Sequence, residues 1–174
     1  MKSLGKLSGG LLPGNGAFVA VLRELTGLEP VVAGKPDPAL HLESVARVQA
    51  QRPLVVGDRL DTDVLGAVRG GADSLLVLTG VTDLPGLLAA PVGLRPTYVA
   101  TDLSALGRPQ PPVVVEAGAQ GRPVAATCGT ARAEVVEGTA VVVTDPAGGR
   151  AAGGGDAPLR ARTALAWALA DGQR

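Results

Sequence analysis

The stretch VVGDRLDTDVLGA, residues 55–67, decides the expected fold, because an apolar run is followed at once by three carboxylates. Residues 54–57 form a short, β-branched run that ends at a glycine, a pattern typical of a buried strand. Asp58, Asp61 and Asp63 then fall within six positions, where like charges repel each other. Such a cluster directly behind a strand indicates a binding edge.

Outward from this stretch, short apolar runs alternate with segments of helical periodicity. The predicted elements are a helix over 17–26, a strand over 30–34, a helix over 37–51, a strand over 54–57, a helix over 63–68 and a strand over 75–78, with 97–99 as a candidate fourth strand. The residues expected to face inward from the second helix are Leu42, Val45, Ala46 and Val48. This alternation predicts an α/β fold with a partial doubly wound, Rossmann-like parallel sheet covered on both faces.

The two ends of the chain do not show this alternation of strands and helices. Residues 1–16 have no usable periodicity and are expected to form a loose leader. Small antiparallel strands are predicted at 113–116, 124–127, 133–136 and 140–144, followed by a Gly-rich linker at 147–155 and a closing helix at 157–170 that uses Leu165, Leu169 and Trp167 as contacts. We therefore expect a leader at 1–16, a core at 11–107 and a small β-plus-helix extension at 108–174.

Composition and charge exclude several classes of partner. Sixteen basic residues balance sixteen acidic residues, so no overall field draws the chain to nucleic acid or to an anionic membrane. The sequence has no signal-peptide pattern and no apolar run of about 18 residues. The single Cys128 cannot form an internal disulfide and is expected to be a packed thiol. We predict a cytoplasmic protein that binds neither nucleic acid nor membrane.

A lysine is expected at the same edge as the acidic cluster. Lys35 follows the predicted strand at 30–34, and Pro36 disfavours helical geometry there, so the ammonium can project over the sheet. Ligands bind at the carboxyl ends of parallel strands, so Lys35, Asp58 and Asp63 should share one crevice. Carboxylate oxygens together with water molecules are typical ligands of Mg²⁺, and a lysine can bind a phosphate or an acyl-phosphate through its positive charge.

The motifs GKPDP (34–38), VVGDRLDTDVLGA (55–67) and SLLVLTGVT (74–82) together resemble the haloacid-dehalogenase (HAD) superfamily of phosphohydrolases. The nearest branch has a large α/β cap and includes p-nitrophenyl phosphatase-like and phosphoglycolate phosphatase-like enzymes. The resemblance implies a Mg²⁺-dependent phosphomonoester hydrolase that acts on a small phosphorylated metabolite through an aspartyl-phosphate. It also implies that Lys35 stabilises charge at the phosphate, that Asp58 ligates Mg²⁺, and that Asp63 supports the metal site.

One part of the superfamily pattern has no counterpart. Catalysis in these enzymes needs an early Asp-x-Asp motif, a later Ser or Thr motif and, in this branch, a cap, whereas the first aspartate here is Asp37. The chain therefore resembles the back half of an enzyme, and we expect activity to need a complementing N-terminal segment. An exposed sheet edge would also favour self-association. The alternative is a non-catalytic remnant that binds a partner or a metal without turnover.

Other patterns have simpler interpretations. Asp61 is interpreted as a cap of the helix that follows it, and His41 as an ordinary surface or boundary residue. The stretch PGNGAF (13–18) lacks the third glycine of a dinucleotide fingerprint. In a phosphoacceptor receiver domain the lysine follows the acidic sites, whereas Lys35 precedes them, so chain order disfavours a signalling module.

Overall fold

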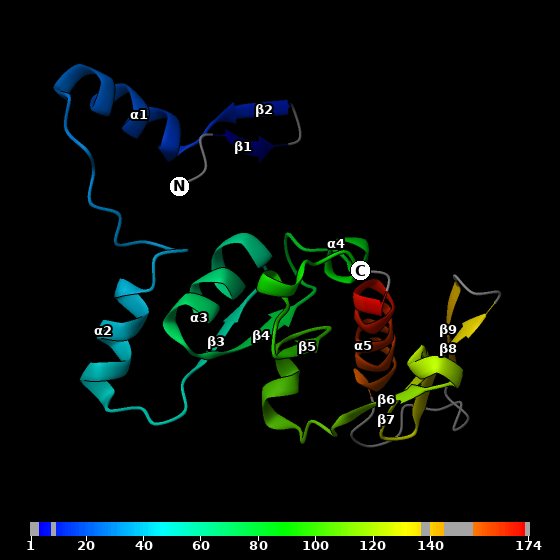
Figure 1. Ribbon diagram of the computed structural model, residues 1–174. Helices are drawn as coiled ribbons and strands as arrows, with labels where there is room; N and C mark the ends of the chain where they lie inside the picture. The colour runs from blue at the N-terminus through cyan, green and yellow to red at the C-terminus, as the bar shows by residue number, and fades with distance from the viewer. Residues whose placement is uncertain (1–3, 8–9, 137–139, 145–154, 173–174) are drawn as a thin grey trace.

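The computed structural model describes residues 4–7, 10–136, 140–144 and 155–172, which form an α/β fold with an N-terminal arm (Figure 1). The strands are β1 (Leu4–Leu7), β2 (Gly10–Pro13), β3 (Leu54–Gly57), β4 (Asp73–Val77), β5 (Tyr98–Ala100), β6 (Val113–Ala117), β7 (Pro123–Cys128), β8 (Ala131–Val136) and β9 (Ala140–Thr144). The helices are α1 (Asn15–Thr26), α2 (Ala39–Val48), α3 (Leu65–Gly70), α4 (Leu84–Leu88) and α5 (Ala157–Gly172), with short turns η1 (Leu60–Val64), η2 (Val92–Leu94), η3 (Leu103–Gly107) and η4 (Ala119–Gly121). No helix among these residues is long and apolar enough to cross a membrane.

The first sheet is parallel, as the sequence predicts, and has the order β3-β4-β5. Neighbouring side chains on β4 point to opposite faces. Leu76 packs against residues of η1, α4 and α5 on one face, while Leu75 and Val77 pack against η3 on the other. Both faces are therefore covered around the central strand. Within the described residues, β3 pairs on one side only.

The second sheet is antiparallel, with the order β6-β7-β8-β9, and it confirms the small strands predicted for this part of the chain. The core between this sheet and α5 consists mainly of alanines, together with Cys128 and Leu165. Small side chains allow the helix to lie close to the strands. The predicted linker at 147–155 falls almost entirely outside the described residues, and the domain boundaries stay predictions.

Helix α5 joins the two sheets. Leu165 is buried against the antiparallel sheet, whereas Trp167 packs against the parallel-sheet core and donates its indole N–H to the Leu87 carbonyl at 3.0 Å. Arg95 lies 5.3 Å from the centre of the Trp167 ring and pairs with Asp171 at 2.6 Å. The predicted closing helix and its contacts are confirmed.

The N-terminal part differs from the sequence expectation. Residues 4–7 and 10–13 pair as an antiparallel hairpin, where no regular structure was expected. The strand predicted at 30–34 is wrong: these residues are not in a strand, and Val31 is 97% exposed. A β-branched run becomes a strand only where a partner edge satisfies its backbone groups, and this segment instead forms an extended connection to α2 (Figure 1).

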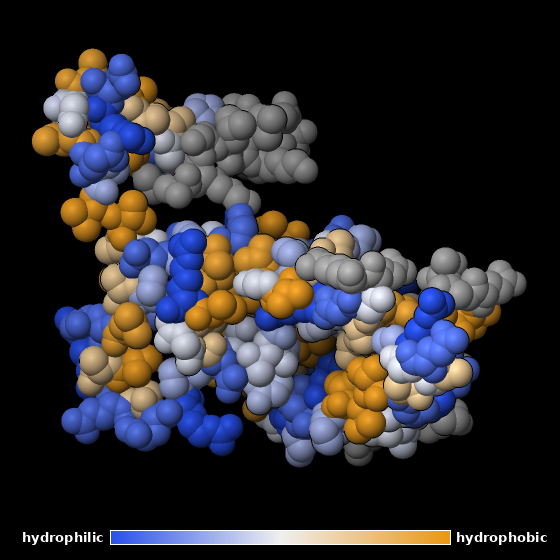
Figure 2. All heavy atoms as spheres, in the orientation of Figure 1, coloured by the Kyte–Doolittle hydropathy of each residue, from blue (hydrophilic) through white to orange (hydrophobic). Residues whose placement is uncertain are grey.

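Helix α1 carries apolar side chains that face solvent. The helix ends at Gly27 in a left-handed conformation, as its sequence indicates. Its exposed apolar residues are Phe18, Val21, Leu22 and Leu25, and Figure 2 shows hydrophobic spheres on this arm. In α2, Leu42, Ala46 and Val48 are also exposed, so the expectation that they face inward is wrong, and of the four residues expected there only Val45 is half-buried. Helix α1 contacts β1 and β2, and α2 contacts α3, but these contacts leave the named apolar side chains exposed.

We predict that this exposed surface causes concentration-dependent self-association. Replacing Leu22 and Leu25 together by Glu should shift the purified chain toward monomer, because the change removes apolar area that association would bury. Sedimentation equilibrium at several protein concentrations measures the shift. Glu24→Gln, in the same helix but outside the apolar stripe, is the matched control. A wild-type chain that is monomeric at all concentrations would contradict the prediction.

Candidate functional site

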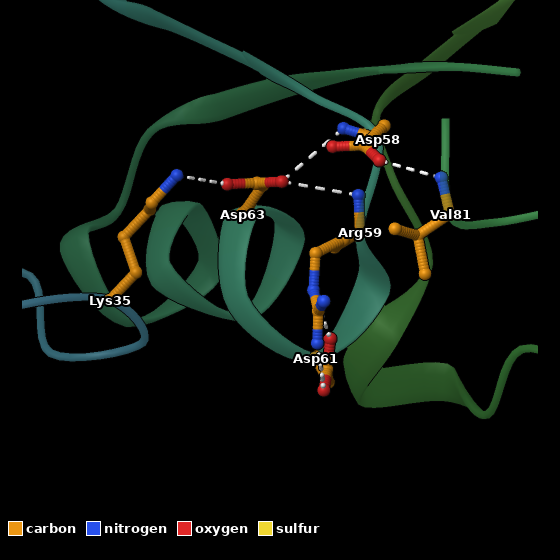
Figure 3. Close-up of polar contacts among 6 residues, drawn as sticks. All are labelled: Lys35, Asp58, Arg59, Asp61, Asp63 and Val81. Carbon is orange, nitrogen blue, oxygen red and sulfur yellow. Dashed lines mark hydrogen bonds and ion pairs between the residues drawn. The ribbon is translucent and has the colours of Figure 1, made fainter. Parts of the chain in front are cut away.

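The loops that follow β3 and β4 are joined by Asp58. Its Oδ2 accepts a 2.6 Å hydrogen bond from the Val81 backbone N–H (Figure 3). Its backbone carbonyl also accepts from the Thr82 N–H at 3.0 Å. Asp58 directly follows β3, and residues 78–82 follow β4, so the contact lies at the carboxyl edge of the parallel sheet. This is the edge at which the sequence placed the binding crevice.

Asp63 is the centre of the polar network at this edge. Its side chain is buried, and its Oδ1 accepts from the Lys35 ammonium at 2.6 Å. Its Oδ2 accepts from the backbone N–H groups of Asp58, at 3.2 Å, and Arg59, at 3.1 Å (Figure 3). Both oxygens of this carboxylate are therefore engaged. The structure brings Lys35, Asp58 and Asp63 into one network as expected, although the strand that was predicted to place Lys35 there does not form.

Two glycines allow the carboxylates to lie this close to the backbone. A Cβ on Gly57 would lie 2.3 Å from Cγ of Asp63, and a Cβ on Gly80 would lie 2.1 Å from Oδ2 of Asp58. Both distances are far below van der Waals contact. Gly57 and Gly80 are thus parts of the site that sequence reasoning did not single out, although each is the glycine at or just beyond a strand end.

Lys35 reaches the network from a loop. The Asp37 N–H donates to the Gly34 carbonyl, which closes a turn around Lys35, and Oδ1 of Asp37 accepts from the Ala39 N–H at the start of α2. The helix begins at Ala39 with Pro38 in the capping position, two residues later than the predicted start at residue 37, and Asp37 binds the first helical N–H from just outside the helix. The lysine side chain is 51% exposed, so its ammonium contacts Asp63 while remaining open to solvent. Such a cation is available to an anionic ligand.

The interpretation of Asp61 as a helix cap is wrong. Its two oxygens lie 3.2 Å from Nε and Nη2 of Arg59, two residues earlier in the chain. The capping position of η1 is Arg59, and that of α3 is Val64, so Asp61 lies inside the first turn and not at a cap. Asp61 thus belongs to a partly exposed ion pair at the rim of the site.

The two remaining residues considered from the sequence lie outside the network. His41 is half-buried, and its Nε2 is buried without a hydrogen-bond partner among the described residues. Cys128 is fully buried in β7, where burial raises the pKa of its thiol and its Sγ lies 3.6 Å from the Pro111 carbonyl. The prediction of a packed thiol is confirmed.

The donor set limits the kind of metal site that this part of the chain can make. Oδ2 of Asp58 binds the Val81 N–H, while Oδ1 has no hydrogen-bond partner among the residues that the structure describes. Among the described residues, no group of three or more His, Cys, Asp or Glu side chains is placed to hold a metal. A single free carboxylate oxygen beside a half-exposed loop fits Mg²⁺, which keeps several waters and takes one or two carboxylates. It does not fit an all-protein cage.

Comparison with known proteins gives consistent matches. Residues 32–106 match a family model described as HAD-hydrolase-like. Over 97 residues the chain is 56% identical to the D-glycerol 3-phosphate phosphatase of Mycobacterium tuberculosis, an alignment that covers 56% of this chain and 28% of that protein. The p-nitrophenyl phosphatase of Archaeoglobus fulgidus superposes with a TM-score of 0.53 and 34% identity, over 60% of this chain and 42% of that one.

One solved structure extends the match into the second sheet. The crystal structure of a glycerol phosphate phosphatase from Mycobacterium tuberculosis, in complex with magnesium, superposes with a TM-score of 0.65 and 38% identity. It covers 95% of this chain and 46% of that chain. The β-plus-helix extension therefore has a counterpart there. This chain spans less than half the length of the relatives it matches.

We predict that Gly57→Ala destabilises the fold by displacing Asp63. The added methyl group would overlap a buried carboxylate that cannot move without losing its hydrogen bonds, and such overpacking costs about 1–3 kcal/mol. Urea unfolding, followed by circular dichroism, measures the loss. Gly93→Ala is the control, because nothing lies within 4 Å of the added Cβ there, and it should change stability by less than about 0.5 kcal/mol. Equal stability of the two variants would contradict the proposed close packing.

Proposed function

Residues 32–106 are a HAD-hydrolase-like region, and from that premise we propose that the chain supplies the lysine and magnesium side of a phosphomonoester hydrolase site. The observation that supports this most is the network in which Asp63 joins Lys35 to the backbone of Asp58 at the carboxyl edge of the sheet. The proposed substrates are small phosphorylated metabolites, and the cytoplasm is the proposed location. Glycerol phosphate is the first to test, because a 56% identical relative is named for it.

In this proposal Asp58 holds Mg²⁺ through Oδ1. Val81 fixes the other oxygen of the carboxylate, so the free oxygen has a defined direction. When bound, Mg²⁺ would offset charge on the phosphate oxygens and help to orient the substrate. Asp63 supports the site from behind, because both of its oxygens already bind protein N–H groups.

Lys35 has a different part in the same proposal. Asp63 holds its ammonium at the edge of the sheet, and the side chain remains half-exposed. A lysine placed in this way contributes a point charge to a phosphate or to an acyl-phosphate. It also offsets the repulsion between the two neighbouring aspartates. A cationic lysine is not an attacking group, so its role is to bind and stabilise charge.

The attacking carboxylate of this proposal comes from outside these 174 residues. The sequence has no Asp-x-Asp motif ahead of the GKP turn, and its first aspartate is Asp37. The free side of β3 lies next to Asp58 and could pair with one further strand carrying such a motif. One carboxylate delivered there would attack phosphorus and break the P–O bond to the alcohol, while the second aspartate of the motif would give the leaving alcohol its proton. Water would then hydrolyse the acyl-phosphate to inorganic phosphate and restore both carboxyl groups. This covalent route divides one difficult step into two easier ones.

The first prediction from this proposal ranks the three aspartates by their effect on Mg²⁺ binding. Asp58→Asn should weaken binding most, because it removes the charged ligand. Asp63→Asn should weaken it by about 10- to 100-fold, the usual cost of losing a supporting group. Asp61→Asn should be nearly neutral, because exposed ion pairs such as that with Arg59 contribute about 0–1 kcal/mol. Isothermal titration calorimetry with MgCl₂ measures all three, and equal losses would refute the assignment.

The second prediction concerns turnover. The purified chain with Mg²⁺ should not hydrolyse p-nitrophenyl phosphate or glycerol 3-phosphate at an ordinary enzymatic rate of about 1 per second. Joining an upstream segment that carries Asp-x-Asp-Gly, fused or as a separate peptide, should produce Mg²⁺-dependent activity. The same segment with both aspartates changed to Asn is the matched control and should be inactive.

Two outcomes would overturn parts of the proposal. If the chain alone turns over substrate and Lys35→Ala abolishes that activity, a nucleophile lies within these residues. If the joined segment binds but no activity appears, the alternative of a non-catalytic remnant is favoured. The exposed side of β3 and the apolar arm would then serve partner binding alone.

A further inference from the structure

A cavity of about 440 Å³ lies where the two sheets meet α5. Its walls come from the start of β5, the segment 110–113 that leads into β6, and the middle of α5. It is within the usual size range of small-molecule sites, which often form between structural layers. It borders Thr97 and Tyr98 at the amino end of β5, whereas Asp58 lies beyond the carboxyl end of β3. The cavity is therefore separate from the proposed phosphate site.

Arg160 gives this cavity a positive charge. The residue is only 8% exposed, and it donates through Nη2 to the Pro111 carbonyl. No described Asp or Glu forms an ion pair with it, and no acidic residue lines the cavity. Arginines are rarely buried so deeply without a carboxylate partner. Its guanidinium keeps donors in excess of the single carbonyl that it binds, so it can accommodate an anion.

Gln110 also lines this cavity, and its side-chain oxygen has no hydrogen-bond donor among the described residues. Its amide nitrogen donates to the Ala105 carbonyl at 3.4 Å, while its Oε1 is buried without a hydrogen-bond partner. An orphaned buried oxygen of this kind costs about 1–3 kcal/mol, which a ligand donor could recover. The cavity thus combines a cationic donor with a free acceptor.

The remaining walls are largely apolar. Tyr98, Trp167, Pro111 and Pro112 border the cavity. The Trp167 indole N–H is already bound to the Leu87 carbonyl, so the ring offers the cavity its apolar surface. Apolar walls with a few convergent polar groups are typical of small-molecule sites.

We propose that this cavity binds a small organic carboxylate with an apolar body and an N–H or O–H donor. The carboxylate binds the guanidinium of Arg160, whose fork matches its two oxygens. The donor binds Oε1 of Gln110, and the apolar body packs against Trp167. This site does not depend on the phosphatase proposal, since none of its residues belongs to the Lys35–Asp63–Asp58 network.

N-acetyl-L-phenylalanine has these three features and is the probe for the test. Trp167 is the only tryptophan in the chain, so its fluorescence reports on the cavity directly. Titration of the full chain should give a saturable change. N-acetyl-L-phenylalaninamide has the same shape without the charge and should bind at least about tenfold more weakly, because it loses a charge-assisted hydrogen bond. Inorganic phosphate, which has no apolar body, should not compete.

Variants locate the binding. Arg160→Gln should remove the preference for the acid over the amide, whereas Arg162→Gln, in the same helix but outside the cavity lining, should keep it. Ala164→Phe should fill the cavity and abolish binding of both probes, and it tests the site even if Arg160→Gln does not fold. Three results would each overturn the proposal: no saturation up to the solubility limit of the probe, equal affinity for acid and amide, or unchanged binding in Ala164→Phe. Competition by inorganic phosphate would overturn the assignment to carboxylates.

Discussion

The buried carboxylate of Asp63 is the constraint on which the edge of the parallel sheet depends. It fixes the turn after β3 through two backbone N–H groups and ties down Lys35 through its other oxygen. Burying a charged carboxylate costs desolvation free energy, which hydrogen bonds to its oxygens must offset. Removing any one of these partners would leave part of that desolvation cost without compensation. Gly57 has no side chain because the carboxylate occupies the space where a Cβ would lie.

The local signals of the sequence predicted most of the fold. The helices α1 and α5 follow from apolar spacing, and β3 and β4 follow from short apolar runs. The contact of Lys35 with Asp63 was expected at the end of a strand at 30–34, whereas the lysine makes it from a loop. The strand predicted at 30–34 failed because pairing depends on a partner edge that no short window contains. The prediction that Asp61 caps a helix was also wrong. The oxygens of Asp61 instead bind the guanidinium of Arg59.

The near absence of aromatic residues explains how α5 serves two cores. Alanines of β7 and β8 let one side of the helix approach the antiparallel sheet closely, while the single tryptophan fills the space toward the parallel sheet. Asp156 strengthens this seam, because its Oδ1 accepts from both the backbone N–H and the hydroxyl of Thr101 at 2.7 Å. Small side chains cannot fill every gap where layers meet, and the cavity beside Arg160 lies at that seam.

The polar network at the sheet edge is complete within the described residues. The Asp63 carboxylate accepts hydrogen bonds from the Lys35 ammonium and the Asp58 backbone N–H. The Val81 N–H binds Oδ2 of Asp58 and so fixes the orientation of that carboxylate. The geometry therefore needs no further segment to hold it, whereas the proposed chemistry does. Under the proposed function, Mg²⁺ binding and turnover of a phosphate ester would therefore be separable: the first would depend on groups already held in place, and the second on a carboxylate that reaches the free side of β3.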